Sequence, residues 1–539
     1  MLRTAARTTQ TLDLSIPGRL TCAMLEQAAQ PVQVAISDEQ LNLVALCRIF
    51  MLEQLAKGEQ IYGATTGFGP LVTYSGRDNM ADQCDNIVYH LLAGHGEDLP
   101  PRVVRATALI RLWSLAQGHS GASVQVLSAL TAMLSTSFAP AVPRIGSLGA
   151  SGDLIPLAHL THALRGHGYA YVDGVRMPAR DALVAANLNP VELDGRDGLA
   201  LVNGTSLTTA AAGLALASLH RSHTVAMLLS AVLTDMLGSA PNFLSADLLQ
   251  AFGHPAAAAA AAQMRGWLDG IVPTGNRPLQ EPYSIRCTPQ LLGAVGESLQ
   301  HADTVVADDL NGVSDNPMFF HERGEVVHGG NFFGQPAAFA ADLLSTGTIQ
   351  MGNLAERQLD LLIDPHRNTG LAPMLSVEPG RKHGVQGIQL AATATVAAMR
   401  RAATPASVQS IPTNGHNQDV VPFGTQAALN ALDLATELRW LHGSLALALR
   451  QAIHVGGRRP TAPACATVID QLMDAIAPID ADRALDDDVQ TAANLLDDIA
   501  DEYNHEHPSA EDASPNNPTI RSLCDVEPEI PDDVTRRLT

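Results

Sequence analysis

A glycine-rich turn at 149–152 holds the residues best suited to unusual chemistry. Ala150, Ser151 and Gly152 lie within G-S-L-G-A-S-G-D-L-I-P-L at 146–157. Because Gly152 has no Cβ, its amide nitrogen can approach and attack the carbonyl of Ala150. Loss of water there, and of a second water from the Ser151 side chain, would leave a five-membered ring with an exocyclic alkene. The triplet therefore predicts an electrophile made from the chain itself; the ordinary alternative is a turn before a helix, capped by Ser151 or Asp153.

Other routes to an electrophile or a nucleophile find little support in the sequence. The chain has only two lysines, Lys57 and Lys382, which limits Schiff-base chemistry with pyridoxal phosphate (PLP). Its six cysteines are scattered without a C-x-x-C pair, a pattern typical of free thiols in a reducing cytoplasm. No phosphate-binding loop and no complete dinucleotide or nucleophile-elbow motif is present. We therefore expect neither PLP nor a metal.

The charge distribution argues against nucleic acid as a partner. The formal net charge is −22, whereas phosphate binding needs a concentrated basic surface. The segment from Asp480 to the end holds 17 Asp and Glu against four Arg, so −13 of that charge lies there. The most apolar stretch, 208–237, carries charged and histidine side chains midway, and residues 1–11 lack an apolar signal region. We expect a cytoplasmic protein that does not enter a membrane.

Seven segments, in this order along the chain, resemble one known family, the histidine, phenylalanine and tyrosine ammonia-lyases. The resemblance spans roughly residues 31–453, so it does not depend on a single short pattern. The segments are Y-G-A-T-T-G-F-G at 62–69, G-A-S-G-D-L-I-P-L-A-H at 149–159, G-L-A-L-V-N-G-T at 198–205, Q-E-P-Y-S-I-R-C-T-P-Q at 280–290, D-L-N-G-V-S-D-N-P at 309–317, H-G-G-N-F at 328–332 and N-Q-D-V-V at 417–421.

The resemblance implies a cofactor and a set of catalytic residues. Ala150, Ser151 and Gly152 would become 4-methylidene-imidazol-5-one (MIO), the ring that the family uses as its electrophile. Tyr62 would be the base that removes the β-proton of the bound amino acid, helped if its phenol pKa is lowered in the site. Asn203 and Tyr283 would line the ring and hold it or the leaving amine.

The same resemblance implies residues that bind the substrate. Arg286 would pair with the substrate carboxylate, a bidentate task that suits a guanidinium. The remaining positions expected around the substrate are His90, Leu91, Asn331, Phe332, Gln386, Asn414, Asn417 and Gln418. For Arg286 a structural ion pair is the alternative, and for Phe332 ordinary packing in a core.

The substrate is expected from the segment N-I-V-Y-H-L-L-A-G-H-G at 86–96. His90-Leu91 resembles the selectivity pair of tyrosine enzymes, in which a histidine can hydrogen-bond a para-hydroxyl; a satisfied core histidine is the alternative. Asp419 stands where histidine lyases typically have Glu. Gln386 and the pair Pro422-Phe423 depart from the family pattern, which keeps an unusual substrate or a 2,3-aminomutase outcome open.

The elements that must position these residues fall into three parts. Residues 1–205 read as a mixed N-terminal domain carrying the ring, with alternating strands at 12–16 and 32–36 and helices at 82–92 and 101–135. A capping box, Ser37 with Gln40, opens a further helix that ends near 57–58. Residues 206–479 predict a central bundle of long Ala- and Leu-rich helices, and 480–539 an acidic, partly disordered tail. We therefore expect a mainly α-helical fold with an elongated bundle.

These observations converge on one leading function and on named alternatives. We expect non-oxidative deamination of an aromatic L-amino acid, with L-tyrosine giving p-coumarate and ammonia. The alternatives are a β-tyrosine-forming aminomutase, a histidine ammonia-lyase and, last, a non-catalytic scaffold of the same fold. The resemblance also implies a homotetramer whose active sites are each assembled from three subunits.

Overall fold

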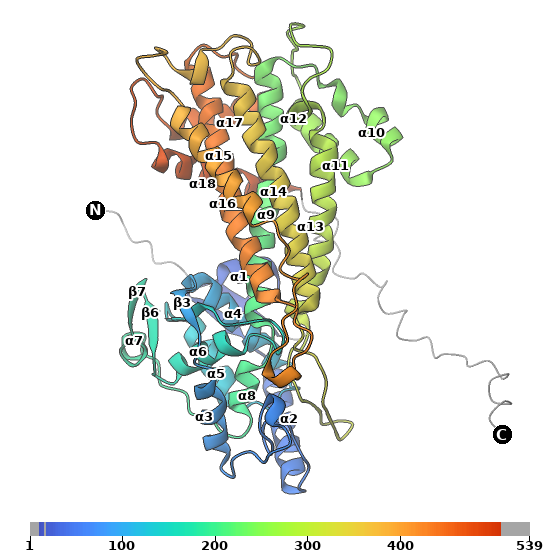
Figure 1. Cartoon of the computed structure of the whole chain (residues 1–539), viewed down its shortest axis with the longest axis vertical. Helices are drawn as coiled ribbons and strands as arrows, with labels where there is room; N and C mark the ends of the chain where they lie inside the picture. Colours follow the sequence, from blue (N-terminus) through green and yellow to red (C-terminus); the bar gives the residue numbers. More distant parts are fainter. Residues whose placement is uncertain (1–9, 16–17, 508–539) are drawn as a thin grey trace, which may run out of the picture.

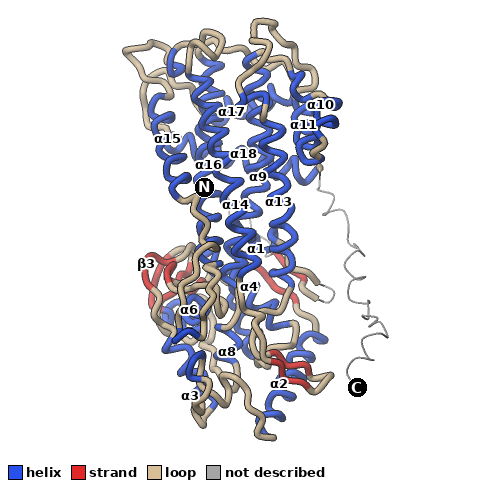
Figure 2. The backbone as a smooth tube through the Cα atoms, turned by 45° about the vertical axis from the view of Figure 1, so that its right-hand side comes forward, coloured by secondary structure: helices blue, strands red, loops and turns tan. Residues whose placement is uncertain are grey.

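The computed structural model describes residues 10–15 and 18–507, and it is elongated, with two lobes joined by long helices (Figure 1). The fold is mainly α-helical, as expected, and the few short strands are confined to the lower lobe, drawn red in Figure 2. No helix in these ranges is long and apolar enough to cross a membrane.

The first part of the chain forms the lower lobe. Its elements are β1 (Gln10–Asp13), α1 (Cys22–Gln27), β2 (Val32–Ala35), α2 (Asp38–Ala56), η1 (Gly69–Leu71), α3 (Met80–His90), β3 (His95–Asp98), α4 (Pro101–Ala116), α5 (Val124–Leu134), β4 (Ala139–Pro140), β5 (Pro143–Ile145), α6 (Leu154–Leu164), β6 (Tyr169–Val172), β7 (Val175–Pro178), α7 (Ala179–Ala185) and α8 (Asp197–Val202). β1 pairs with β2 in parallel, β3 with β5 antiparallel, and β4, β6 and β7 form a three-stranded sheet. These sheets are small, so helix packing forms most of the core.

Local sequence signals explain two helix boundaries in this lobe. The capping box of α2 is present: Ser37 Oγ accepts the Gln40 N–H at 3.2 Å, and Gln40 Oε1 accepts the Ser37 N–H at 2.9 Å. The single helix expected over 101–135 was wrong, because the chain breaks between α4 and α5. Gly118 and Gly121 there have φ of +75° and +64°, which belong to the left-handed region and end an α-helix.

The second part forms the long-helix bundle and its outer helices. Its elements are α9 (Ser206–Leu237), η2 (Pro241–Leu244), α10 (Ala246–Phe252), α11 (Pro255–Trp267), α12 (Tyr283–Arg286), α13 (Thr288–Asn311), β8 (Met318–Phe320), β9 (Glu325–Val327), α14 (Gln335–Ile363), η3 (Pro373–Leu375), α15 (Gln386–Arg401), η4 (Asn414–His416), α16 (Gly424–His454), α17 (Pro463–Ala475) and α18 (Asp486–Glu506). The helices α9, α13, α14 and α16 run between the lobes (Figure 1).

Small side chains let these helices pack closely, as the abundance of alanine suggested. A Cβ added to Gly443 of α16 would lie 2.4 Å from the carbonyl oxygen of Val489 in α18, so the two backbones nearly touch there. The helix α18 lies inside the segment that the sequence assigned to a partly disordered tail. It is docked on the bundle, with Arg439 Nε donating to Asp497 Oδ2 at 2.6 Å. The remainder of that segment, 508–539, lies outside the described residues.

Candidate active site

The Ala150–Ser151–Gly152 turn lies between β5 and α6 and can be built only with glycine at its last position. Gly152 has φ of +68°, and a Cβ there would lie 2.3 Å from the carbonyl oxygen of Gly204. The Gly152 N–H donates to the Phe332 carbonyl at 2.8 Å. A bridge between Gly152 and Gly204 aligns the turn with the segment that follows α8. The turn is therefore held against two distant parts of the chain.

The ordinary alternative for this turn, a helix cap, is absent. Asp153 is the N-cap residue of α6, but its side chain makes no capping hydrogen bond. Ser151 Oγ instead accepts a hydrogen bond from Gln418 Nε2 at 2.5 Å. The Ser151 carbonyl accepts one from Asn203 Nδ2 at 3.0 Å. Both polar groups of Ser151 thus face side chains that the sequence assigned to the site.

The fully buried carboxylate of Asp153 ties the turn to two long helices. It accepts hydrogen bonds from Ser147 Oγ at 2.8 Å, from the Thr208 N–H at 2.8 Å and from Thr425 Oγ1 at 2.8 Å. Burial raises the pKa of Asp153, and those hydrogen bonds oppose the rise. The sequence singled out Asp153 only as a possible cap, whereas it joins α6, α9 and α16 behind the turn.

The N-terminal ends of α6, α9, α14 and α16 converge on this turn. The Gly334 N–H, just before α14, donates to the Gly149 carbonyl at 3.0 Å. A Cβ on Gly149 would lie 3.0 Å from the Gly424 nitrogen, where α16 begins. Phe423, immediately before α16, adopts φ of +52°, which is uncommon for a bulky side chain. Helix N-termini carry partial positive charge, so the turn lies in a field that favours electron uptake.

Tyr62 lies in a loop that is anchored at both its backbone and its hydroxyl. Its N–H donates to His328 Nε2 at 3.2 Å, and its Oη accepts the Gly69 N–H at 2.7 Å. Burial raises the pKa of Tyr62, while the Gly69 N–H and the charge of Arg196 oppose the rise. The lowered phenol pKa that would help Tyr62 act as a base is therefore not found in the single chain, because desolvation is the larger effect.

An aromatic contact links Tyr62 to the predicted selectivity residue. Phe68 packs edge-on against the Tyr62 ring, with centroids 6.3 Å apart, and stacks on the His90 ring at 5.8 Å. His90 ends α3, and its Nδ1 is 2.8 Å from the Asn86 carbonyl oxygen. Because a carbonyl only accepts, Nδ1 carries the proton, and the neutral ring presents Nε2 as an acceptor. Sequence reasoning missed Phe68, although it lies within the matched segment 62–69; Leu91 follows as the half-buried C-cap.

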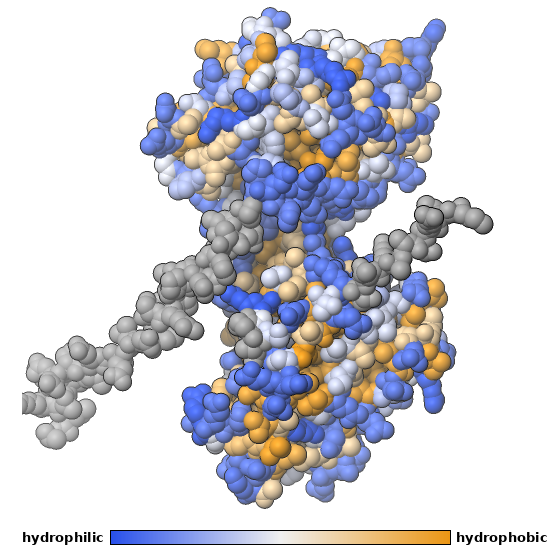
Figure 3. Space-filling view, turned by 180° about the vertical axis from the view of Figure 1, so that it is seen from behind, coloured by the Kyte–Doolittle hydropathy of each residue, from blue (hydrophilic) through white to orange (hydrophobic). Residues whose placement is uncertain are grey.

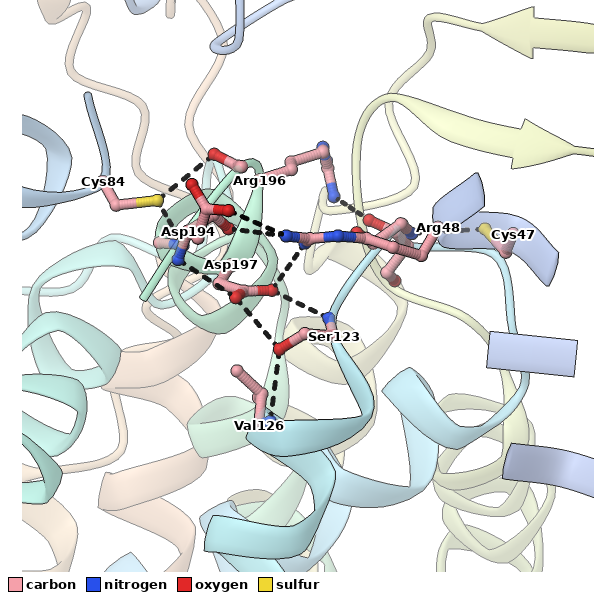
Figure 4. Close-up of polar contacts among 12 residues, drawn as sticks. Cys47, Arg48, Cys84, Ser123, Val126, Asp194, Arg196 and Asp197 are labelled. Atoms are coloured by element: carbon pink, nitrogen blue, oxygen red, sulfur yellow. Dashed lines mark hydrogen bonds and ion pairs between the residues drawn. The ribbon is translucent and has the colours of Figure 1, made fainter. Parts of the chain in front are cut away.

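Asn203 lies at the end of a short helix whose first residue is held in place by hydrogen bonds. It is the C-cap of α8, whose first residue, Asp197, accepts hydrogen bonds from Arg48 Nη1 at 2.9 Å and from the Ser123 N–H at 2.8 Å (Figure 4). The Asn203 side chain is 4% exposed, and its Oδ1 has no partner in the described part of the chain. That acceptor is available to a donor brought by a ligand.

Other predicted residues lie in segments that contact the Tyr62 loop or the turn. Asn414 lies in η4, which packs beside η1 of the Tyr62 loop, and Asn417 is its C-cap. Asn331 is exposed and its Nδ2 lies 3.3 Å from Met318 Sδ, while Phe332 reaches the turn through its carbonyl. These residues lie on the lower-lobe side of the molecule, as Ser151 does.

Three predicted residues lie at the other end of the bundle. Tyr283 and Arg286 belong to α12, and Gln386 begins α15, both in the upper lobe of Figure 1. The helix α14 starts beside Gly149, and its Gln358 Nε2 donates to the Ser284 carbonyl at 3.0 Å. At about 1.5 Å per residue these two contacts are roughly 35 Å apart along α14. Tyr283 is 72% exposed, so within one chain it faces solvent and does not approach Ser151.

Arg286 is oriented locally, and no carboxylate among residues 10–15 and 18–507 forms an ion pair with it. Its Nε donates to the Glu281 carbonyl at 2.8 Å, and its guanidinium carbon lies 4.6 Å from the centroid of the Tyr283 ring. These contacts fix the side chain without neutralising it. The guanidinium remains suited to an incoming carboxylate.

Comparisons with known proteins agree on one family. A sequence profile of the aromatic amino acid lyase family matches residues 20–474. The histidine ammonia-lyase of Aromatoleum aromaticum is 36% identical over 496 residues, covering 90% of this chain and 92% of the relative. That of Geobacillus thermodenitrificans is 36% identical and covers 86% and 92%.

Solved structures give the same fold with more varied activities. The tyrosine aminomutase of Streptomyces globisporus has a TM-score of 0.83 at 31% identity, covering 90% of this chain and 97% of that chain. The histidine ammonia-lyase of Trypanosoma cruzi has a TM-score of 0.84 at 25% identity, covering 93% and 96%. The special closeness to tyrosine ammonia-lyases expected from 86–96 is not supported, because the sequence relatives carry the name of the histidine enzyme.

Proposed function

The chain belongs to the aromatic amino acid lyase family, and from that premise we propose that it eliminates ammonia from an aromatic L-amino acid, with L-tyrosine as the leading substrate. The observation that carries the proposal is the geometry of the turn at 150–152. Gly152 leaves no room for a Cβ, and Ser151 makes no helix cap. Asn203 and Gln418 both point at Ser151. This arrangement fits the MIO ring that the triplet predicts.

The residues around the turn have distinct tasks in such an elimination. Ala150, Ser151 and Gly152 would hold the ring within the chain, and its alkene would supply the electrophile that the substrate amine needs in order to leave. Tyr62 removes the β-proton, since its N–H is bound by His328, four residues before the Phe332 carbonyl that binds the turn. Asn203 Nδ2 holds the Ser151 carbonyl, and the helix N-termini stabilise negative charge that develops there. An α,β-unsaturated acid and ammonia are then released.

His90 supports tyrosine as the substrate. With Nδ1 committed to the Asn86 carbonyl, Nε2 is an acceptor that the phenol O–H of tyrosine can satisfy. Phenylalanine brings no donor, so it would leave this nitrogen without a partner and bind less well. The likeness to a tyrosine aminomutase, at 31% identity, points to the same amino acid.

Histidine is the second candidate, because the most similar curated relatives described above are histidine ammonia-lyases at 36% identity. A substrate imidazole could also donate an N–H to His90 Nε2. Tyrosine is placed first because Asp419 stands where those enzymes typically have glutamate, and because His90-Leu91 is the pair expected of tyrosine enzymes. An aminomutase outcome, in which the amine returns at Cβ, uses the same groups and is favoured by the same solved relative.

We further propose that the active site is completed by other copies of the chain in a homotetramer. Tyr283 and Arg286 lie roughly 35 Å from the turn along α14, so one chain cannot bring its own carboxylate-binding group to its own Ser151. The long helices also expose large apolar side chains, among them Phe339 at 58% and Leu390 at 66%. Apolar patches, orange in Figure 3, occur on both lobes beside the narrow waist.

Two measurements on one purified sample test the function. The intact mass should be lower than that of the translated sequence by two water molecules, with the loss located in a peptide containing 150–152. Incubation with tyrosine, phenylalanine and histidine should then give the absorbance of an unsaturated acid fastest with tyrosine. An intact triplet would reject the elimination; faster urocanate formation from histidine would move the substrate to the second candidate, and β-tyrosine would identify the mutase.

A further inference from the structure

Two arginines are buried in helix α4, and they differ in how well their charge is accommodated. Arg105 is 2% exposed and donates to five backbone carbonyls at 2.6–2.9 Å, those of Ala28, Gln30, Leu134, Thr136 and Phe138. Arg111 is 0% exposed but donates only through Nη1, at 2.9 Å each to the carbonyls of Asn203 and Ser314. Its Nε and Nη2 have no partner in the described part of the chain.

The environment of Arg111 is unfavourable for a cation. No carboxylate among the described residues makes an ion pair with it, because the neighbouring Asp315 is bound at both oxygens by Arg196 at 2.8 Å. Burial lowers the pKa of Arg111 to about 10, which leaves the group charged at neutral pH. A buried charge with unsatisfied donors costs folding free energy.

The backbone is shaped to admit this guanidinium. A Cβ added to Gly204 would lie 2.0 Å from Arg111 Nη1 and 2.7 Å from the Ser314 carbonyl oxygen, so a side chain there would displace the guanidinium and press on the Ser314 backbone. Ser114, one helical turn further along α4, accepts the Ser314 N–H at 3.2 Å. Side chains of α4 therefore hydrogen-bond both the Asn203 carbonyl and the backbone of Ser314.

The segment 203–204, which Arg111 contacts, also holds the reactive turn at 150–152 in place. Asn203 Nδ2 donates to the Ser151 carbonyl at 3.0 Å, and the Gly204 carbonyl accepts the Asp153 N–H at 2.7 Å. Ring closure forms a bond between Gly152 N and Ala150 C and expels the Ala150 oxygen as water, with the amide hydrogens of Ser151 and Gly152. Loss of Ser151 Oγ with the Ser151 Cα hydrogen gives the second water. No oxidant is needed, but Gly152 N and Ala150 C must be held close to each other.

We propose that Arg111 is a positioning residue that fixes the Asn203–Gly204 backbone against Ser151 and Gly152, so that the triplet cyclises and Asn203 stays aimed at the finished ring. The proposal rests on the proposed function, because it concerns the same ring. Arg111 touches neither the triplet nor the substrate, and it acts through Asn203. Its role therefore differs from the purely structural role of Arg105, which reaches other carbonyls of the same lobe.

The test compares substitutions at the two arginines in the full-length chain. Arg111→Met keeps the length of the side chain but removes its charge and donors, and Arg111→Lys restores the charge. Arg105→Lys is the matched control, since it disturbs a buried arginine of the same helix. For each protein we measure the fraction that has lost two waters, the melting temperature, and kcat and KM separately.

We expect Arg111→Met to be cyclised to less than about half, and to lose about tenfold or more in kcat with KM within about threefold. Arg111→Lys should recover part of both readouts. Arg105→Lys should lower the melting temperature while the ring forms completely. Gly204→Ala, which displaces the guanidinium, should reproduce the Arg111→Met result.

Complete cyclisation and wild-type kcat in Arg111→Met would overturn the inference. So would a loss of ring in Arg105→Lys as large as in the Arg111 variants, since the ring would then follow stability alone. If Arg111→Met does not fold, Arg111→Lys and Gly204→Ala decide by the same readouts. A wild-type chain that keeps both waters would reject the proposed function itself, which distinguishes the two failures.

Discussion

Replacing His90 by phenylalanine should shift substrate preference from tyrosine toward phenylalanine. In the structure the Nδ1–H of His90 donates a hydrogen bond to the Asn86 carbonyl. When the ring is neutral, Nε2 can therefore only accept. Phenylalanine at position 90 keeps an aromatic ring to stack on Phe68 but removes that acceptor. His90 is exposed in the single chain, so the full effect applies in an assembled site that shields it from water. A tyrosine hydroxyl there would have no partner, which costs about 1–3 kcal/mol, or roughly 5- to 150-fold in kcat/KM.

The assay is the ratio of kcat/KM for tyrosine to that for phenylalanine, from the absorbance of the two unsaturated acids. His90→Phe should lower this ratio by at least about tenfold, within the range set by one unpaired hydroxyl. His90→Gln is the matched control, because its amide oxygen can still accept, and it should keep most of the tyrosine preference. A ratio unchanged in His90→Phe would refute the assignment of His90, whatever the absolute rates.

Four further outcomes follow from the site and the core. Tyr62→Phe should keep the mass loss of two waters but lower kcat by about 10²-fold or more, and a wild-type kcat would exclude Tyr62 as the base. Because burial raises the pKa of Tyr62 and the base must be ionised, kcat/KM should keep rising with pH to about 10; a plateau well below that would contradict this reasoning. Mixed tetramers refolded from inactive Tyr62→Phe and Arg286→Ala chains should recover activity, whereas a site built from one chain would recover none. Burial lowers the pKa of His442 to about 3, so the stability linked to its neutral form is complete above pH ~6.5 and is lost as pH falls toward 3; the melting temperature of His442→Leu should fall less over that range.

The sequence predicted the helical class and much of the reactive turn, because these depend on short segments. Helix periodicity and the capping box at Ser37 are local, and the structure confirms them. The triplet, Asn203 and Gln418 came from motif matches, and the structure brings all three motifs together. A motif can identify such residues because their types and order along the chain are those that the reaction requires.

What the sequence could not supply are contacts between distant segments. Phe68 links Tyr62 to His90 only after α3 packs beside the loop, and His328 reaches the Tyr62 N–H across 266 positions of the chain. Arg111 has no motif of its own, and its isolation is visible only in the packed core. The raised pKa of Tyr62 is likewise a property of burial and cannot be read from the Gly-rich pattern around it.

The bracing of the turn at 150–152 has a consequence for how the protein is made. The carbonyl of Phe332, the side chain of Gln418 and the start of α16 at Gly424 all come from chain that is synthesised long after the turn. A nascent chain that has not reached these residues has only part of the contacts that hold the turn, those from Asn203 and Gly204. The proposed loss of two waters, if it needs all of these contacts, would take place only in molecules that have completed their fold, and the mass of the peptide containing 150–152 would report their fraction.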